Sequence, residues 1–213
     1  YFKQNNIAIL AGGSGLFIDA CIKGLHDLPK KDETLRAALE ATLAQQGISA
    51  LQEQLKQLDA EHYQRIDSNN PHRLIRAIEI CLTTGKSISE YRNKTLPERY
   101  FETKYFVLSL EREKLYQRIN ERVDKMLDMG LINEAKALYP YRNLQAVNTV
   151  GYQELFAYFE NRMSLDEAIE LIKQNSRRYA KRQITWFKKR NASFIPVAQN
   201  PADTAAQILA QIK

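Results

Sequence analysis

The sequence predicts an α/β protein interrupted by a mostly helical insertion. Two short apolar runs, Ile7–Ala11 and Tyr105–Leu110, have the composition of buried parallel strands. Each is followed by a helical pattern, and the residues between them contain helix signals and no convincing strand. We therefore expect residues 1–27 and 101–213 to belong to an α/β core and residues 28–100 to form the helical insertion. Because a parallel strand needs neighbours, we interpret the chain as the latter part of a larger α/β protein.

The first strand pattern runs into a glycine-rich turn, Gly12-Gly13-Ser14-Gly15, and then into a helix. Backbone N–H groups at such a turn can face an anionic ligand. A tight strand-to-helix turn without a ligand explains the same residues equally well. The turn lacks the Gly-Lys-Ser/Thr ending of a Walker motif.

Cap residues place the remaining elements. Helices are expected from Asp32 to Gly47, from Ser49 onward, and from Asn70-Pro71 to Gly85, each with a polar start or a glycine stop. Downstream, a long helix should run from Glu111 to Met129 and end at Gly130. Phe194–Val197 should form a last strand, at a sheet edge because it contains a proline, and Asn200-Pro201 should start a terminal helix.

The most unusual segment lies between Lys173 and Arg190, which holds eight basic residues and no acidic one in a chain of net charge +6. At helical spacing, Arg177, Arg178, Lys181, Arg182, Lys188 and Lys189 share one arc, opposite Tyr179, Ala180, Ile184, Trp186 and Phe187. Ser164 with Glu167 forms a capping-box pattern, so one helix should span about Leu165 to Arg190. This basic face favours a nucleic-acid partner over an ordinary solvated face.

Composition argues against several other classes of protein. The 213 residues are 44% hydrophobic, with neither an apolar run of membrane-spanning length nor a signal-peptide pattern. Cys21 and Cys81 stand alone, and the three histidines are scattered, so disulfide, zinc and Ser/His/Asp roles are not indicated. We expect a soluble protein of the reducing cytoplasm that functions as a monomer and does not bind membranes.

Three further groups leave two interpretations open. On the helix after Asn70, His72, Arg73, Arg76 and Glu79 form a polar arc that either contacts a partner or is simply solvated. On the 111–129 helix, Arg122 is expected within the apolar stripe of Leu115, Ile119, Met126 and Met129, with Arg118 at its edge. Arg122 is then either a structural residue or a ligand for an anion such as diphosphate. Tyr152, after Gly151, either stacks on a base or belongs to the core.

Five segments, in this order, resemble the bacterial tRNA dimethylallyltransferases, also called tRNA isopentenylpyrophosphate transferases. They are AGGSGLFIDA, NPHRLIRAIEI followed by TTGKS, RINERVDKMLDMGL, NTVGYQE and AKRQITWFKKR. They span nearly the whole chain. Two positions depart mildly from the family pattern, since Ser14 is more often threonine and Phe17 more often tyrosine.

The resemblance implies a P-loop NTPase-like core, incomplete here, with a helical insertion that closes on the tRNA anticodon stem-loop. It implies transfer of a dimethylallyl group from dimethylallyl diphosphate to N6 of the adenosine 3′ of the anticodon, with Mg²⁺ assisting loss of diphosphate. Arg122 resembles a diphosphate-binding residue. The positions that match tRNA contacts are Ser14, Arg36, His72, Arg73, Leu74, Ile75, Arg76, Asn148, Thr149, Val150, Gly151, Tyr152, Gln153, Lys181, Arg182, Gln183, Ile184, Thr185, Trp186, Phe187 and Lys188.

One family feature is missing from this chain. The family's P-loop and aspartate general base precede its glycine turn, and only eleven residues precede Gly12 here. We therefore expect no catalytic residue within the chain itself. Two rival functions are a non-catalytic RNA-binding module and an enzyme that prenylates free adenine nucleotides.

Overall fold

The computed structural model describes residues 2–26, 28–92, 96 and 98–212. The chain forms two compact units. We call Tyr1–Gly15 with Glu102–Lys213 the α/β unit, and Leu16–Phe101 the helical unit. The predicted insertion at 28–100 lies inside the helical unit, which also includes residues 16–27.

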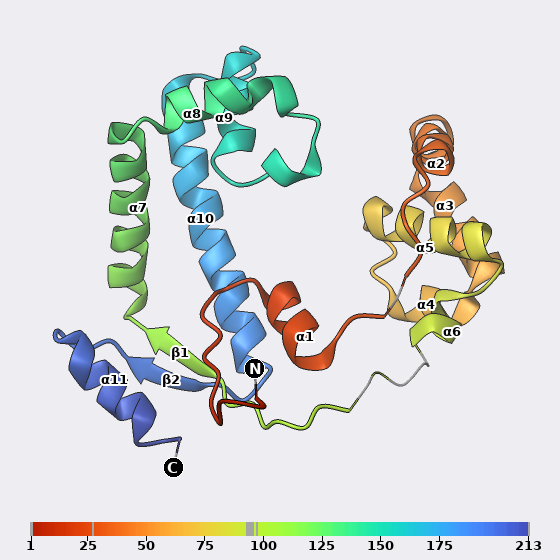
Figure 1. The fold of residues 1–213 in the computed structure, drawn as a ribbon. Helices are drawn as coiled ribbons and strands as arrows, with labels where there is room; N and C mark the ends of the chain where they lie inside the picture. The colour runs from red at the N-terminus through yellow and green to blue at the C-terminus, as the bar shows by residue number, and fades with distance from the viewer. Residues whose placement is uncertain (1, 27, 93–95, 97, 213) are drawn as a thin grey trace. The chain divides into compact units, whose positions relative to one another are not determined.

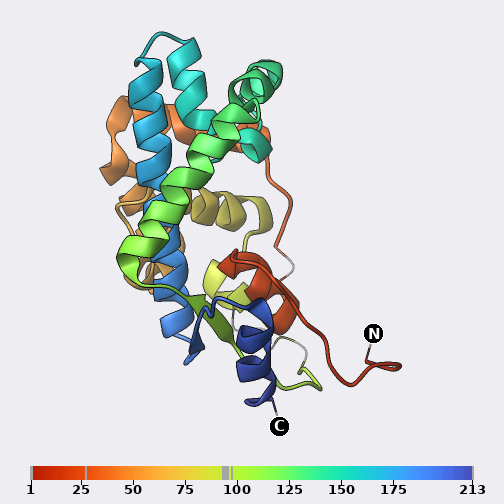
Figure 2. The same ribbon diagram turned by 90° about the vertical axis from the view of Figure 1, so that its left-hand side faces the viewer.

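The α/β unit contains a two-stranded parallel sheet of β1 and β2, with Phe106 paired to Ser193 and Leu108 to Ile195. Its elements are β1 (Phe106–Ser109), α7 (Arg112–Asp128), α8 (Leu131–Leu138), the 3₁₀ turns Tyr139–Tyr141 and Gln145–Val147, α9 (Tyr152–Phe159), α10 (Leu165–Lys188), β2 (Ser193–Pro196) and α11 (Pro201–Leu209). Helices α7 and α10 lie side by side, with α8 and α9 at one end of the pair (Figure 1, Figure 2).

The core of the α/β unit lies among these helices. Its fully buried members are Val123, Leu131, Ala135, Leu155, Phe156 and Ile172. Tyr139 and Phe159 add edge-to-face ring contacts at the same place. The 24-residue helix α10 is therefore anchored through its first half by apolar packing, while its second half continues toward β2.

The helical unit is built from α1 (Gly15–Lys23), α2 (Glu33–Gln46), α3 (Ile48–Leu58), α4 (Ala60–Arg65), α5 (Pro71–Thr84) and α6 (Ile88–Arg92), with the first residue of α1 belonging to the other unit. The predicted caps are confirmed at Asp32, whose carboxylate accepts from Leu35 N–H, and at Asn70, whose side chain accepts from Arg73 N–H. Helix α5 ends at Gly85, which has φ 66°. Helices α2, α3 and α5 share one apolar core that includes Leu51, Leu55 and Ile78.

The predicted first strand is wrong for this structure. Residues 7–11 have no strand pairing, and Ile7, Ile9 and Leu10 are exposed. The apolar run has strand composition, but a strand forms only where a neighbouring strand accepts its hydrogen bonds, and in the described residues β1 and β2 pair with each other alone. The other predicted strands and the long helices at 111–129 and 165–190 are confirmed within two residues.

Candidate nucleic-acid interface

Helix α10 starts with the predicted capping box. Ser164 Oγ accepts from Glu167 N–H at 3.2 Å, and Glu167 accepts from Ser164 N–H at 2.7 Å. The Ser164 backbone N–H is the main reason that the pKa of Glu167 lies below its ordinary value. The cap satisfies backbone N–H groups at the start of α10 and so marks where the helix begins.

Five cations point away from the body of the unit along the second half of α10. This basic face consists of Arg178, Lys181, Arg182, Lys188 and Lys189, all exposed. Within the described ranges, none of the five forms an ion pair with a carboxylate. Five uncompensated positive charges along one stripe suit a phosphate backbone.

Two cations of the segment from Lys173 to Arg190 contact α7 within the α/β unit and do not belong to the basic face. Arg177 Nη1 donates to Asn120 Oδ1 on α7 at 2.6 Å, which corrects its assignment to the exposed arc. Lys173 pairs with Asp124 at 2.8 Å, and this contact raises the pKa of the lysine. Tyr179 is also corrected, because its ring is exposed and lies beneath the Arg182 guanidinium instead of facing the core.

The glycine-rich turn at residues 12–15 packs against the C-terminal end of α10. Gln183 Nε2 donates to the Gly13 carbonyl at 3.0 Å. A Cβ at Gly15 would overlap the rigid Trp186 indole, so close packing favours glycine there, whereas a Cβ at Gly13 would displace the flexible Gln183 amide and its hydrogen bond. The structure thus brings the predicted contact residue Ser14 next to the predicted segment at 181–188.

Aromatic packing orients the end of this helix. Trp186 and Phe187 contact each other edge to face, and both contact Tyr105 just before β1. The Arg190 guanidinium covers the Trp186 ring. Trp186, Phe187 and Ile184 are half-buried, so most of their surface supports the helix.

The turn before α9 carries the next group of predicted residues. Asn148, Thr149, Val150 and Gln153 are exposed, whereas Gly151 is buried with φ 106°, a backbone conformation that favours glycine. Gln153 Nε2 donates to Asn148 Oδ1, and Gln153 N–H donates to the Thr149 carbonyl. Four side chains of the turn are therefore available to a partner.

Tyr152 takes part in the packing of the unit. Its ring stacks on Phe156 with an interplanar angle of 16°, and its hydroxyl donates to Glu134. The hydrogen bond to Glu134 raises the pKa of the Tyr152 hydroxyl. Of the two interpretations of Tyr152, these contacts favour the packing role.

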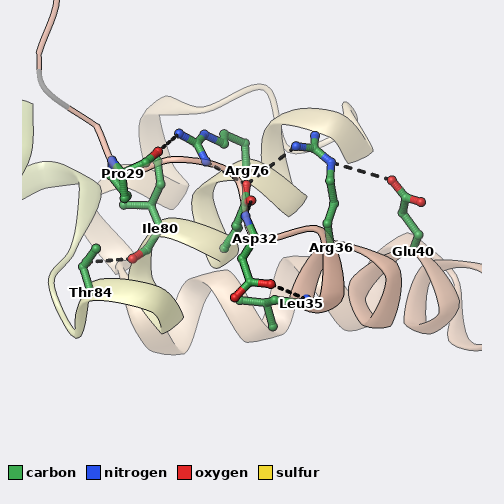
Figure 3. Close-up of polar contacts among 9 residues, drawn as sticks. Pro29, Asp32, Leu35, Arg36, Glu40, Arg76, Ile80 and Thr84 are labelled. Atoms are coloured by element: carbon green, nitrogen blue, oxygen red, sulfur yellow. Dashed lines mark hydrogen bonds and ion pairs between the residues drawn. The ribbon is translucent and has the colours of Figure 1, made fainter. Parts of the chain in front are cut away.

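The helical unit positions Arg36 and Arg76 around one buried carboxylate, Glu79, which is 1% exposed. Arg76 Nη1 donates to Glu79 at 2.9 Å and Arg76 Nη2 donates to the Pro29 carbonyl at 2.7 Å. Arg36 lies 3.7 Å from Glu79 and 3.8 Å from Glu40 (Figure 3). Asp32 N–H also donates to Glu79, which ties the start of α2 to α5.

The polar arc predicted on α5 is only partly correct. His72 and Arg73 are exposed, but Glu79 is buried. Leu82, which helical spacing predicts on the opposite, apolar arc of the helix, is exposed. Leu74 and Ile75 are 0% and 1% exposed. Their side chains belong to the core and are not available at a tRNA-binding surface, because the α2–α3–α5 packing occupies both flanks of the helix.

Arg122 lies on the exposed side of α7, and the predicted stripe is rotated relative to the observed one. The residue that α7 buries is Val123, while Met129 is 86% exposed. Asn120 and Asp124 contact α10, so the face of α7 toward the core is centred about one residue further along α7 than predicted. The predicted placement of Arg122 within an apolar stripe is therefore wrong, and its diphosphate role stays a prediction from the resemblance.

Sequence patterns missed Glu154 and Asn175, and they placed Glu79 on a polar arc although it is buried. Glu79 and Glu154 are buried carboxylates, and Asn175 links Glu154 to α10. The spacing of Arg76 to Glu79 and of Gly151 to Glu154, three residues in each case, is the available signal, since it matches a helical ion pair and a capping box. In the described part of the chain, no three His, Cys, Asp or Glu side chains are grouped to hold a metal.

Comparison with known proteins shows the family of the chain. A family model described as IPP transferase matches residues 1–190. The chain belongs to the IPP transferase family. Among curated members of the family, the tRNA dimethylallyltransferase of Christiangramia forsetii is 50% identical over 188 residues, which cover 88% of this chain and 62% of the relative. That of Geobacillus thermodenitrificans is 49% identical over 189 residues, or 87% of this chain and 60% of the relative.

Solved IPP transferase structures are also similar. The full-length tRNA isopentenylpyrophosphate transferase of Bacillus halodurans is 36% identical with a TM-score of 0.56, covering 94% of this chain and 63% of that chain. A eukaryotic dimethylallyltransferase described as acting on tRNA is 26% identical with a TM-score of 0.64, covering 88% of this chain and 50% of that chain. The chain thus spans about three fifths of the length of the curated relatives that it matches.

Proposed function

We propose that the protein containing this chain transfers a dimethylallyl group from dimethylallyl diphosphate to N6 of the adenosine 3′ of a tRNA anticodon, as a cytoplasmic monomer. One observation carries the RNA part of the proposal: the basic face of α10 and the exposed turn at 148–153 are connected within one unit by side-chain hydrogen bonds. A polyanion bound along the five cations would therefore lie beside a turn able to contact a base. The relatives named tRNA dimethylallyltransferase support the reaction type.

The proposed reaction is a displacement. A bond forms between the adenine N6 and the first carbon of the dimethylallyl group, the bond from that carbon to diphosphate oxygen breaks, and the N6 proton passes to a general base. By the family resemblance, that base and the phosphate-binding loop are expected outside these 213 residues. The contribution of this chain is to bind and orient the RNA, with Arg122 exposed on α7 and able to approach an anion.

Mg²⁺ belongs to the proposal for the full-length enzyme, where it would neutralise charge on the leaving diphosphate. The described residues contain no group of three His, Cys, Asp or Glu side chains, and Mg²⁺ is commonly held by one or two carboxylates together with substrate phosphates. No step is assigned to the metal on this chain. No helix of the described residues combines the length and apolarity needed to cross a membrane.

A prenylation assay tests the proposal. Full-length protein is incubated with labelled dimethylallyl diphosphate and either tRNA or AMP, and label in each acceptor is measured. We expect label in tRNA and none in AMP, because a stripe of five cations is useful only on an extended polyanion. Label in AMP would indicate the nucleotide prenyltransferase instead. Tight tRNA binding with no label in either acceptor would indicate a non-catalytic RNA-binding module.

A further inference from the structure

Glu154 is a buried carboxylate that no sequence pattern assigned to the site. It lies in the first turn of α9 and is 3% exposed. Its Oε2 accepts from Gly151 N–H at 2.7 Å, and its Oε1 accepts from Asn175 Nδ2, also at 2.7 Å. A buried carboxylate is costly unless its oxygens are hydrogen-bonded, and here each oxygen has a neutral donor at short distance.

The contact with Gly151 determines the conformation of the exposed turn. Gly151 has φ 106° and precedes the first residue of α9, where a backbone N–H has no partner within the helix. Glu154 provides that partner from three residues downstream. Because Gln153 closes the rest of the turn onto Asn148 and Thr149, the turn is braced internally and then fixed at its last residue by Glu154.

Asn175 continues the chain of contacts into α10. Its Nδ2 donates to Glu154, while its Oδ1 accepts from Arg178 Nη1 at 3.2 Å. Arg178 is the first cation of the basic face. A line of hydrogen bonds thus runs from the basic face through Asn175 and Glu154 to the backbone of the turn.

We propose that Glu154 and Asn175 are positioning residues that hold the turn at 148–153 in register with the basic face of α10, so that both meet tRNA as one rigid surface. This inference rests on the proposed tRNA function and deepens it. The basic face supplies affinity through phosphates, whereas the turn places the reacting nucleotide. Loosening the connection should therefore lower kcat and leave the tRNA KM nearly unchanged.

A polarity swap tests the connection. In Glu154→Gln, the new amide places a donor against either Gly151 N–H or Asn175 Nδ2. A flip of the Asn175 amide that relieved the second clash would turn its Nδ2 toward the Arg178 guanidinium and lose that contact. In Asn175→Asp, two carboxylates face each other. In the double variant, the introduced glutamine can donate through its Nε2 to the introduced aspartate while its oxygen still accepts from Gly151 N–H, and the aspartate keeps an oxygen for Arg178. The double variant restores all three contacts, and only the one between positions 154 and 175 has its donor and acceptor exchanged.

The variants are compared in full-length protein by steady-state prenylation of tRNA. Misplacement of a bound substrate by about 1 Å costs on the order of 100-fold in rate, so we expect kcat to fall by roughly 10- to 100-fold in each single variant. The tRNA KM should change by less than about threefold, and the double variant should recover kcat to within about threefold of wild type. Equal kcat in wild type and Glu154→Gln, or no recovery in the double variant, would overturn the proposal.

Glu167→Gln is the matched control. Glu167 also accepts the backbone N–H of a helix cap, that of Ser164, but it is exposed and lies at the other end of α10. Its substitution should leave kcat unchanged.

Asn175→Ala covers the case in which Glu154→Gln folds poorly. It removes the hydrogen bond between Asn175 and Glu154 at a half-buried position and keeps the contact between Glu154 and Gly151 N–H. A wild-type kcat in Asn175→Ala would equally overturn the proposal.

Amide hydrogen exchange separates this inference from the proposed function. Exchange at Gly151 N–H should be faster in Glu154→Gln and slow again in the double variant, whatever the substrate of the protein. If the wild type does not prenylate tRNA but the exchange pattern holds, the proposed function fails and the connection stands. If tRNA is prenylated but Gly151 exchange is the same in all variants, the positioning role is overturned and the function stands.

Discussion

Asp59 is a buried aspartate at the start of α4 whose two oxygens accept three hydrogen bonds. Oδ1 accepts from His62 N–H and from the Ser89 hydroxyl, both at 2.9 Å, and Oδ2 accepts from Ser89 N–H at 3.0 Å. Burial raises the pKa of this carboxyl, but the backbone and hydroxyl donors outweigh burial and hold the pKa below its ordinary value. Asp59 thereby fastens α6 to the cap of α4.

The depressed pKa of Asp59 predicts an acid-dependent loss of stability. The stabilisation is complete above the unfolded pKa of about 3.9 and is lost as pH falls from there through the lower folded pKa. In Asp59→Asn, the new amide faces the Ser89 donors, so the free energy of unfolding at pH 7 should fall by about 1–3 kcal/mol. Urea unfolding with hydrogen exchange at α4 and α6 in the full-length protein measures this value. Equal stability of the two proteins at pH 7 would contradict the prediction.

At the scale of elements, α10 combines an anchoring role with an exposed charged stripe. Its first half packs Ala168 and Ile172 into the core, and Arg177 is held by Asn120. The stripe from Arg178 to Lys189 is left to solvent. One helix thus carries the predicted phosphate contacts. The residues that anchor it in the unit are different from the five cations of the basic face.

Replacing three cations of the basic face by alanine should weaken tRNA binding and flatten its salt dependence. Lys181, Arg182 and Lys188 are exposed and free of ion pairs in the described part of the chain. Each lost phosphate contact should reduce the slope of log K against log salt by about 0.7–0.9. Titrations of full-length protein with tRNA at several salt concentrations measure the slope, and circular dichroism should be unchanged because Trp186 and Phe187 still anchor the helix.

The control for this experiment removes the same charge elsewhere. Lys114, Lys125 and Lys136 are exposed on α7 and α8 and lie outside the basic face. Their triple alanine variant should keep nearly the wild-type affinity and slope. If both triple variants weaken binding equally, net charge alone attracts the RNA and the basic face has no specific role.

At the scale of the whole molecule, the chain holds an α/β unit with the proposed RNA-binding face and a helical unit, but only two paired strands among the described residues. It covers 62% of the length of the Christiangramia forsetii relative. The family's phosphate-binding loop and general base are expected in the remaining part. Binding and chemistry are therefore expected to be separable.

We predict that the 213-residue chain alone transfers no dimethylallyl group, even at saturating Mg²⁺. We propose that its residues orient RNA, but the resemblance assigns the diphosphate-binding loop and the proton acceptor to another segment. Labelled dimethylallyl diphosphate and tRNA, incubated with the purified chain and with full-length protein in parallel, give the measurement. Turnover by the chain alone would mean that the catalytic groups lie among these residues.

Local sequence signals predicted where most helices begin and end. Asp32, Asn70 and Ser164 cap their helices as predicted, and Gly85 ends α5, because caps and left-handed glycines act over three or four residues. The charge of α10 and the five family-like segments were also sufficient to identify the family and the helix that we propose binds RNA.

The side of each helix that faces a neighbour is set by packing between elements and could not be predicted from local patterns. Arg122 lies outside and Val123 inside, Arg177 is bound while Arg178 is exposed, and neighbouring residues on a helix differ by about 100°. Contacts distant in sequence settle such a choice, as between Glu154 and Asn175, which are 21 residues apart, or Asp32 and Glu79, 47 apart. Periodicity gives the width of an apolar arc, but its direction depends on the packing partner, which a local pattern does not contain.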